Sequence, residues 1–236
     1  MPPAPPLPPA PAPPALSVVI PALDAAAALP ATLDALSGWP GAEIVVVDGG
    51  SADGTAALAA ARGCRVLTAA RGRGIQLAAG ARAATGDWLL FLHADTVPAP
   101  GWTDAVMAFL ARPDAGARAG WFRFVLDAAE PQARRLERLV AWRCRVLALP
   151  YGDQGLLLSR RLYGTVGGYR PLPLMEDVDL VRRLGRRRLV PLGAAAVTSA
   201  ARWRRDGWWR RSARNLGCLA LWHLGVPPRL IARVYG

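Results

Sequence analysis

The chain has 236 residues, 53% of them hydrophobic, which is enough for one large domain with a substantial core. All 29 cationic residues are arginines and the formal net charge is +12, a composition that favours phosphate, nucleic acid or anionic lipid as a partner. The three cysteines are widely spaced, which excludes a disulfide framework and a C-x-x-C site and favours a reducing compartment.

The N-terminal residues 1–15 are almost entirely proline and alanine. They lack the basic start and continuous apolar core of a secretory signal, so we expect a disordered tail of polyproline-II character. No apolar stretch approaches the ~20 residues that cross a bilayer. We therefore expect a cytoplasmic protein, with a peripheral position on the inner face of the membrane left open.

Strands and helices alternate regularly in the first half of the chain. Short β-branched runs predict strands at 16–22, 43–51, 65–67 and 88–92, and the intervening segments predict helices at 30–36, 55–63 and 74–84. This order predicts an α/β fold with a mostly parallel central sheet flanked by helices. Ligands of such sheets bind beyond the carboxyl ends of the strands, which here are 21–24, 48–53 and 93–95.

The second half is less regular. We expect helices at 101–110, 131–149 and 177–184, strands at 120–126 and 156–158, and one long C-terminal helix at 206–224. The arginines of the 131–149 helix are expected on its outer face. The predicted organisation is a disordered tail (1–15), a main domain (16–205) and a C-terminal helical extension (206–236).

Two glycine-containing segments suit a nucleotide. In VVVDGGSADGT (45–55), Asp48 at a strand end can accept hydrogen bonds from a base or ribose, and the glycines allow close approach of the backbone. Asp53 is explained equally well as a helix cap. RGRGIQLAAG (71–80) lacks the third glycine of a dinucleotide fingerprint, but an arginine-bearing loop before a helix makes an anion site. A solvated loop is the alternative there.

Two acidic segments can carry the chemistry. In LHADT (92–96), Asp95 follows a buried strand and can hold Mg²⁺ or Mn²⁺ against two phosphates, although a turn-forming role is the alternative. LMEDVDLVRRL (174–184) places Glu176 and Asp179 on one helix face, with Asp177 pointing elsewhere. One of these carboxylates can act as a general base, while stabilisation of the helix N-terminus explains one or two of them.

Arginine and tryptophan are interleaved in SAARWRRDGWWRRSARN (199–215). Arginine can neutralise a diphosphate and tryptophan can stack on a sugar or base, but the same mixture suits nucleic acid or a membrane surface. The plain alternative is a solvated arginine face over a tryptophan-rich core or a homodimer contact.

In their order along the chain, VVIPALD, VVVDGGSADGT, RGRG, FLHADT, YGDQG and MEDVDLVRRL resemble the motifs of glycosyltransferase family 2. The resemblance covers residues 16 to about 205 and is strongest to a small bacterial subgroup of radical-SAM/selenodomain-associated transferases. It implies the GT-A fold and inverting transfer of a sugar from a nucleotide diphosphate sugar, commonly UDP-linked, to a hydroxyl acceptor, with Mn²⁺ or Mg²⁺.

The resemblance also implies roles for individual residues. The nucleotide would contact Pro21, Ala22, Asp24, Asp48, Gly49, Ser51, Arg73 and Ala94. Asp95 would bind the metal, and Asp177, with Glu176 beside it, would be the catalytic base. The diphosphate and the acceptor would contact Gly152, Asp153, Gln154, Arg202 and Trp203.

The chain departs from the family pattern at three positions. His93 replaces the first acid of the D-x-D motif, which leaves one protein carboxylate for a metal or removes the need for one. Asp24 stands where an asparagine is common. Ser199 replaces the glutamine of Q-x-x-R-W, which, with the lack of a predicted membrane span, weakens any link to processive polymer synthases.

Three other functions compete with this one. A membrane-surface transferase would act on a lipid or lipid-phosphate acceptor. A nucleotidyltransferase would have a glycine-rich loop directly after the first strand, where VVIPALDAAA has no glycine. A non-enzymatic protein could bind nucleic acid or an anionic surface through the C-terminus, but acids lined up at the sheet edge would repel a phosphate backbone and disfavour nucleic acid.

Overall fold

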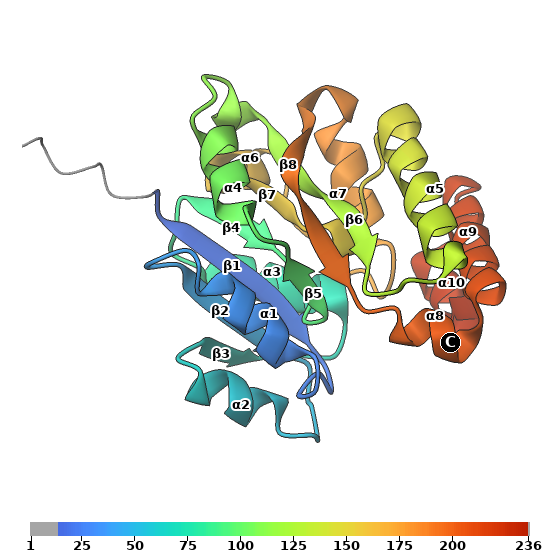
Figure 1. Ribbon diagram of the computed structural model, residues 1–236, viewed down its shortest axis with the longest axis horizontal. Coiled ribbons are helices and arrows are strands. Elements are labelled where there is room, and N and C mark those ends of the chain that lie inside the picture. Colours follow the sequence, from blue (N-terminus) through green and yellow to red (C-terminus); the bar gives the residue numbers. More distant parts are fainter. Residues whose placement is uncertain (1–13, 236) are drawn as a thin grey trace, which may run out of the picture.

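A single eight-stranded sheet runs through the computed structural model, which describes residues 14–235 (Figure 1). The strand order is β3-β2-β1-β4-β7-β6-β8-β5. Nearly all of the predicted tail (1–15) lies outside the described residues. Within 14–235, no helix combines the length and the apolar character needed to cross a bilayer.

The first half of the chain forms the parallel part of the sheet, as predicted. Its strands are β1 (Leu16–Ala22), β2 (Glu43–Asp48), β3 (Arg65–Thr68) and β4 (Trp88–Phe91). β1 is buried along its whole length, which explains its run of apolar residues without polar alternation. In the β1–β2 pairing, Ala22 lies opposite Asp48, so the two strands end side by side.

The second half extends the sheet with mixed pairing. Its strands are β5 (Thr96–Pro98), β6 (Ala119–Leu126), β7 (Leu156–Ser159) and β8 (Leu189–Thr198). β7 runs antiparallel to β4 and β6, whereas β8 is parallel to β6. The sequence did not predict β5 or β8. The 189–198 segment contains Pro191, Gly193 and three alanines, and pairing with β6 and β5 holds it extended despite this weak strand propensity.

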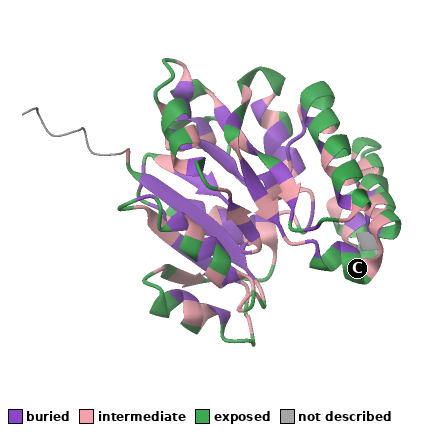
Figure 2. Ribbon diagram, viewed as in Figure 1, coloured by how far each residue is buried: buried purple, intermediate pink, exposed green. Residues whose placement is uncertain are grey.

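Helices cover both faces of the sheet. One face carries α1 (Leu29–Leu36), α2 (Thr55–Ala61) and α4 (Trp102–Leu110), and the other carries α3 (Arg73–Ala83), α6 (Arg160–Thr165) and α7 (Glu176–Leu184). Figure 2 shows that the sheet is mostly buried and that the helices are exposed on part of their surface only. α6 was not predicted. Gly80 lets α3 approach the sheet, since a Cβ there would lie 2.4 Å from Val19.

Helices from the middle and from the C-terminal part of the chain form a layer beside β6. α5 (Pro131–Leu147) packs on β6 with α8 (Ala201–Asp206), followed by α9 (Trp208–His223) and α10 (Pro228–Tyr235). The helix predicted over 206–224 is α9, which begins two residues later than predicted because Gly207 (φ 85°) separates it from α8. α10 was not expected. It packs with α9 around Leu174, directly before α7.

Candidate active site

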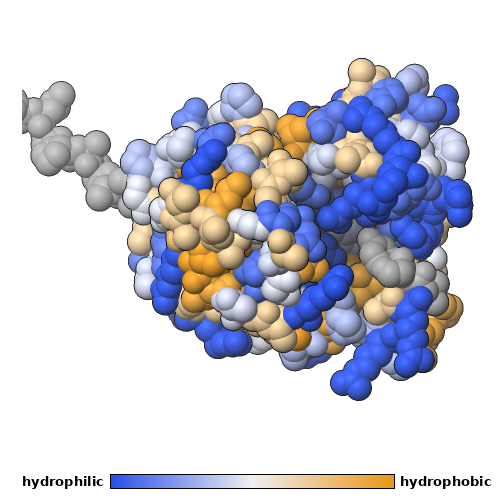
Figure 3. Space-filling model, turned by 90° about the horizontal axis from the view of Figure 1, so that it is seen from below, coloured by the Kyte–Doolittle hydropathy of each residue, from blue (hydrophilic) through white to orange (hydrophobic). Residues whose placement is uncertain are grey.

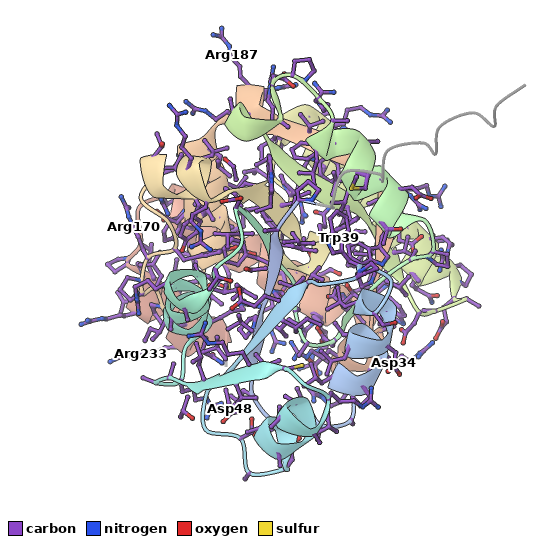
Figure 4. The ribbon with its side chains drawn as sticks, turned by 90° about the vertical axis from the view of Figure 1, so that its left-hand side faces the viewer. Asp34, Trp39, Asp48, Arg170, Arg187 and Arg233 are labelled. Atoms are coloured by element: carbon purple, nitrogen blue, oxygen red, sulfur yellow. The ribbon has the colours of Figure 1, made fainter. Side chains whose placement is uncertain are left out.

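Asp48, at the end of β2, links the ends of β1 and β2. Its side chain is almost fully buried, and Figure 4 labels it. Its Oδ2 atom accepts hydrogen bonds from the backbone N–H groups of Gly50 and Ser51, each with an N···O distance of 3.0 Å. The Ser51 hydroxyl donates to Oδ1 and accepts from Asp24 N. Asp48 and Ser51, both predicted to contact the nucleotide, therefore shape the turn that would receive it.

Two further acids hold this turn in place. Asp24, in the left-handed region (φ 47°), accepts a hydrogen bond from Ala52 N over 2.9 Å. Asp53 accepts from Ala26 N over 2.9 Å and from Thr55 N over 3.1 Å, so it ties the start of α2 to the turn after β1. Asp53 thus has the structural role that the sequence left open for it.

Gln76 is a site-shaping residue that the sequence reasoning missed. Its buried amide nitrogen donates to Ala22 O and Val47 O, each over 2.8 Å, and its side chain packs against Gly49. It joins α3 to the ends of β1 and β2. Its position three residues after Arg73, in the first turn of the helix, was the available signal.

Asp95 follows β4 and is partly open, with 21% of its side chain exposed. Arg202 Nη2 lies 3.8 Å from Asp95 Oδ2, and Ser199 N donates to Asp95 O over 3.4 Å. The start of α8, with Arg202, therefore lies beside Asp95. Neighbouring Ala94 is buried, and its carbonyl accepts a hydrogen bond from Thr32.

His93 is held among cations. Its Nε2 atom lies 3.4 Å from Arg73 Nη1. Burial, and then the charges of Arg73 and Arg202, hold the pKa of His93 well below its usual value. The imidazole is therefore neutral at pH 7 and adds no further positive charge beside the two arginines. As a histidine, it cannot supply the negative charge that an acid gives at this position of the D-x-D motif.

The residues at Asp95 suit a cation that is bound mainly by its substrate. Among the residues that the structure describes, no three acidic, histidine or cysteine side chains form a preformed metal site. Mg²⁺ and Mn²⁺ accept oxygen ligands, and Mg²⁺ often binds through one or two carboxylates plus substrate phosphates and water. The partly exposed Asp95 carboxylate fits that arrangement.

The acids at the start of α7 have different surroundings. Glu176 is fully buried and forms an ion pair with Arg73 Nε. Burial raises its pKa, a shift that Arg73 opposes and Asp177 adds to. Asp177 is less buried and accepts hydrogen bonds from Gly152 N and Val178 N, each over 2.8 Å. Asp179 pairs with Arg170 and Arg183, which identifies it as a structural residue.

The YGDQG segment adds a short turn, η2 (Gly152–Gln154), against these acids. Asp153 Oδ1 is buried without a hydrogen-bond partner in the described chain. Burial, together with the charges of Asp177 and Asp95, raises the pKa of Asp153 to about 6, although Arg143 and Arg73 oppose the shift. Gln154 is directed into the interior, where it donates to Phe122 O and accepts from Arg143.

Arg143 departs from the expected placement of the α5 arginines. It is partly buried, and its guanidinium carbon lies 3.5 Å from the centre of the Tyr151 ring. Trp203 is also inside, packed near Phe124 with a ring-centre separation of 6.2 Å. Of the residues predicted to contact the acceptor and the diphosphate, Gly152 and Asp153 lie near Asp177, and Arg202 lies near Asp95. Gln154 and Trp203 are buried and pack in the interior instead.

These segments enclose one small hollow. It has a volume of about 10 Å³, room for about one water molecule, and lies between β4, η2 and α7. Its polar lining is His93, Gly152, Glu176 and Asp177, and its apolar wall includes Tyr169. Tyr169 was not predicted from the sequence. The predicted meeting of the β4 end with the acids of α7 is present in the structure.

Comparison with known proteins identifies a family and a fold. A model of glycosyl transferase family 2 matches residues 17–170. No curated protein shows significant sequence similarity to the chain. Among solved structures, the mannosyltransferase PcManGT from Pyrobaculum calidifontis, in complex with GDP-Man and Mn²⁺, is similar at 20% identity and a TM-score of 0.62, over 85% of this chain and 60% of that one. The chain thus spans less than two thirds of the mannosyltransferase.

A second similar structure is glucosyl-3-phosphoglycerate synthase from Mycobacterium tuberculosis in complex with Mn²⁺ and UDP-glucose. It has 22% identity and a TM-score of 0.59, over 91% of this chain and 80% of that one. At these identities the similarity establishes the fold alone. The predicted GT-A architecture, a mainly parallel sheet flanked by helices, is confirmed.

Proposed function

Because the chain belongs to glycosyl transferase family 2, we propose that it is an inverting glycosyltransferase that uses a nucleotide diphosphate sugar, with UDP as the leading candidate nucleotide. The observation that carries the proposal is the meeting of two acidic segments, far apart in the sequence, at one crevice. His93, two residues before Asp95, lies against Gly152, whose N–H donates to Asp177.

The donor would bind across the ends of β1 and β2. The turn held by Asp48 would receive the nucleoside, and the diphosphate would lie toward Arg73 and Arg202, whose guanidinium groups suit phosphate oxygens. A Mg²⁺ or Mn²⁺ ion held by Asp95 would offset the charge that develops on the leaving diphosphate. Arg202, beside Asp95, would add to that stabilisation.

The acceptor hydroxyl would attack the anomeric carbon opposite the diphosphate, so that one in-line displacement inverts its configuration. Asp177 would take the hydroxyl proton as general base. Two backbone N–H groups hold its carboxylate in place, whereas Glu176 is fully buried and paired with Arg73. That difference supports Asp177 rather than Glu176 as the base.

Donor binding tests the metal site. We expect one of UDP, GDP, CDP and dTDP to bind in calorimetry only with Mn²⁺ or Mg²⁺ present, and the Asp95→Ala variant to lose that binding. Asp104→Ala, an exposed acid in the first turn of α4, is the matched control and should bind as wild type does. Metal-independent binding, or full binding by Asp95→Ala, would contradict the role of Asp95.

Turnover tests the base. We expect Asp177→Asn to lower kcat by roughly 10²–10⁴-fold while diphosphate binding is kept, because only proton transfer is removed. The comparison variants are Glu176→Gln and Asp179→Asn. Wild-type turnover by Asp177→Asn, with activity abolished in either comparison variant, would assign the base elsewhere. An α-linked product from an α-linked donor would rule out inversion.

A further inference from the structure

Exposed apolar side chains gather on the C-terminal helical layer. Of nine large hydrophobic side chains exposed in the described part of the chain, eight lie on α5, on α9 with its C-cap, or on α10: Leu139, Trp142, Val146, Leu147, Trp209, Leu216, Leu224 and Leu230. The ninth is Met107 on α4. We call the surface formed by the eight residues the docking face.

These residues lie along single helix faces. On α5, Leu139, Trp142 and Val146 have the i, i+3, i+7 spacing of one stripe, and Trp142 is 56% exposed. On α9, Trp209 (63% exposed) and Leu216 are seven residues apart. Each helix packs on the protein through its opposite side, where Val140 and Cys144 of α5 and Cys218 of α9 are buried.

The helices that carry the stripes lie at the same end of the molecule. Figure 1 shows α5 and α9 at this end, and α10 packs against α9. A groove of about 320 Å³ joins the ends of α5, α7 and α9, and its lining includes Leu147, Arg182, Arg186 and His223. Leu224, next to His223, is 80% exposed. Apolar and cationic side chains therefore alternate across the same end of the protein.

The positive charge of the protein is concentrated in this layer. α5 and residues 201–235 contain 13 of the 29 arginines and only two of the 17 acidic residues, Glu137 and Asp206. Both acids are already paired with arginines of the layer. The remaining chain holds 16 arginines and 15 acids, so it is close to neutral. Figure 3 shows hydrophilic side chains gathered at this end, and Figure 4 labels Arg233 of α10.

We propose that the docking face binds the surface of an anionic lipid bilayer, with tryptophan and leucine entering the interface and arginine contacting the headgroups. The composition of the docking face argues against two other partners, a second copy of the chain and a nucleic acid. In a homodimer through this face, the arginines of both copies would face one another, whereas interface cores are depleted of charge. A nucleic acid would satisfy the arginines but would leave the leucine and valine side chains without apolar contacts.

Sedimentation of the full chain with vesicles tests the proposal. We expect binding to vesicles of 7:3 phosphatidylcholine and phosphatidylglycerol and none to phosphatidylcholine alone. The Trp142→Ser/Trp209→Ser variant should lose at least tenfold in partition coefficient at 300 mM NaCl, where charge is screened. Met107→Ser is the matched control, because it removes an exposed apolar side chain outside the docking face, and it should bind as wild type does.

Three results would overturn the proposal. The first is wild-type protein that stays in the supernatant with the anionic vesicles. The second is equal binding by the double variant, which would indicate adhesion by charge alone, as to a nucleic acid. The third is a solution dimer that the double variant converts to monomer. Vesicle binding needs neither donor nor acceptor, so its failure and a failure of diphosphate binding are separate results. With the proposed function, docking would make a lipid-linked hydroxyl or phosphate the acceptor class.

Discussion

At the scale of single residues, the absence of a side chain at Gly152 lets two parts of the site meet. A Cβ at this position would lie 2.5 Å from His93 Nε2 and 3.3 Å from Asp177 Oδ2. Its N–H also donates to Asp177. Glycine is needed here for close approach rather than for an unusual backbone conformation, because its φ is not positive.

Gly152→Ala should therefore reduce activity far more than stability. We expect kcat/KM to fall by roughly 100-fold, since a displacement of about 1 Å in a catalytic group costs that much. Gly164→Ala is the control, because no atom lies within 4 Å of its added Cβ. Steady-state kinetics and thermal unfolding of both variants would check this. Equal activity of the two variants would show that His93 and Asp177 need not stay in place.

Asp153 should make stability depend on pH. Its pKa is about 6 in the folded protein and near 3.8 when unfolded, so the native state binds the extra proton between these values. The protonated Asp153 side chain therefore favours the folded state, and this contribution to stability is fully present below about pH 4 and is lost as the pH rises through 6. We expect Asp153→Asn to raise the free energy of unfolding by about 3 kcal/mol at pH 8 and to add little at pH 4. A gain that is independent of pH would contradict this.

At the scale of elements, the ion pair between Arg73 and Glu176 joins the start of α3 to the start of α7. Gly74, beside Arg73, packs against the backbone of residues 170–172. Because Glu176 is fully buried, its carboxylate depends on that guanidinium for compensation of its charge.

A double-mutant cycle should detect this dependence. We expect Arg73→Gln to cost about 3–5 kcal/mol, because it leaves a buried carboxylate uncompensated. Adding Glu176→Gln should recover part of that loss, giving a coupling energy of about 1–3 kcal/mol in urea unfolding. The exposed Arg62–Asp34 pair is the control and should couple by less than about 1 kcal/mol. Additive effects at Arg73 and Glu176 would disprove the link.

The elements themselves were predicted unevenly from sequence. β1, β2, β4 and α7 were predicted to within a few residues, because runs of apolar residues and acids at a helix start are local signals. β8 was missed because its extended form depends on its neighbours β6 and β5 rather than on its own residues. The C-terminal helix α9 was also predicted to within two residues, whereas the short helix α8 before Gly207 was not expected.

At the scale of the whole molecule, charge is distributed unevenly between two layers. α5 and residues 201–235 hold nearly all of the excess arginine, while the rest is close to neutral. Like charges this close repel one another and lower the stability of the compact state, and salt screens that repulsion.

We therefore expect Tm to rise by about 2–4 °C between 50 and 300 mM NaCl, equivalent to about 1 kcal/mol for a chain of this size. A variant with glutamine at the exposed arginines Arg135, Arg138 and Arg145 should show a smaller rise. Differential scanning calorimetry would measure both. A Tm that falls with salt would mean that ion pairs, and not repulsion, dominate this layer.

The sequence by itself determined the α/β class, the strand ends at Ala22 and Asp48, and the acids available for chemistry. These follow from periodicity and from residue types next to strand ends, which are properties of neighbours along the chain. The tertiary structure decided which candidates meet. It placed Gly152 between His93 and Asp177 and buried Glu176 against Arg73. It also buried Trp203 and Gln154, and it left most of the exposed large apolar side chains on the arginine-rich helical layer. Such contacts join residues far apart in the chain, so they depend on packing that no local pattern encodes.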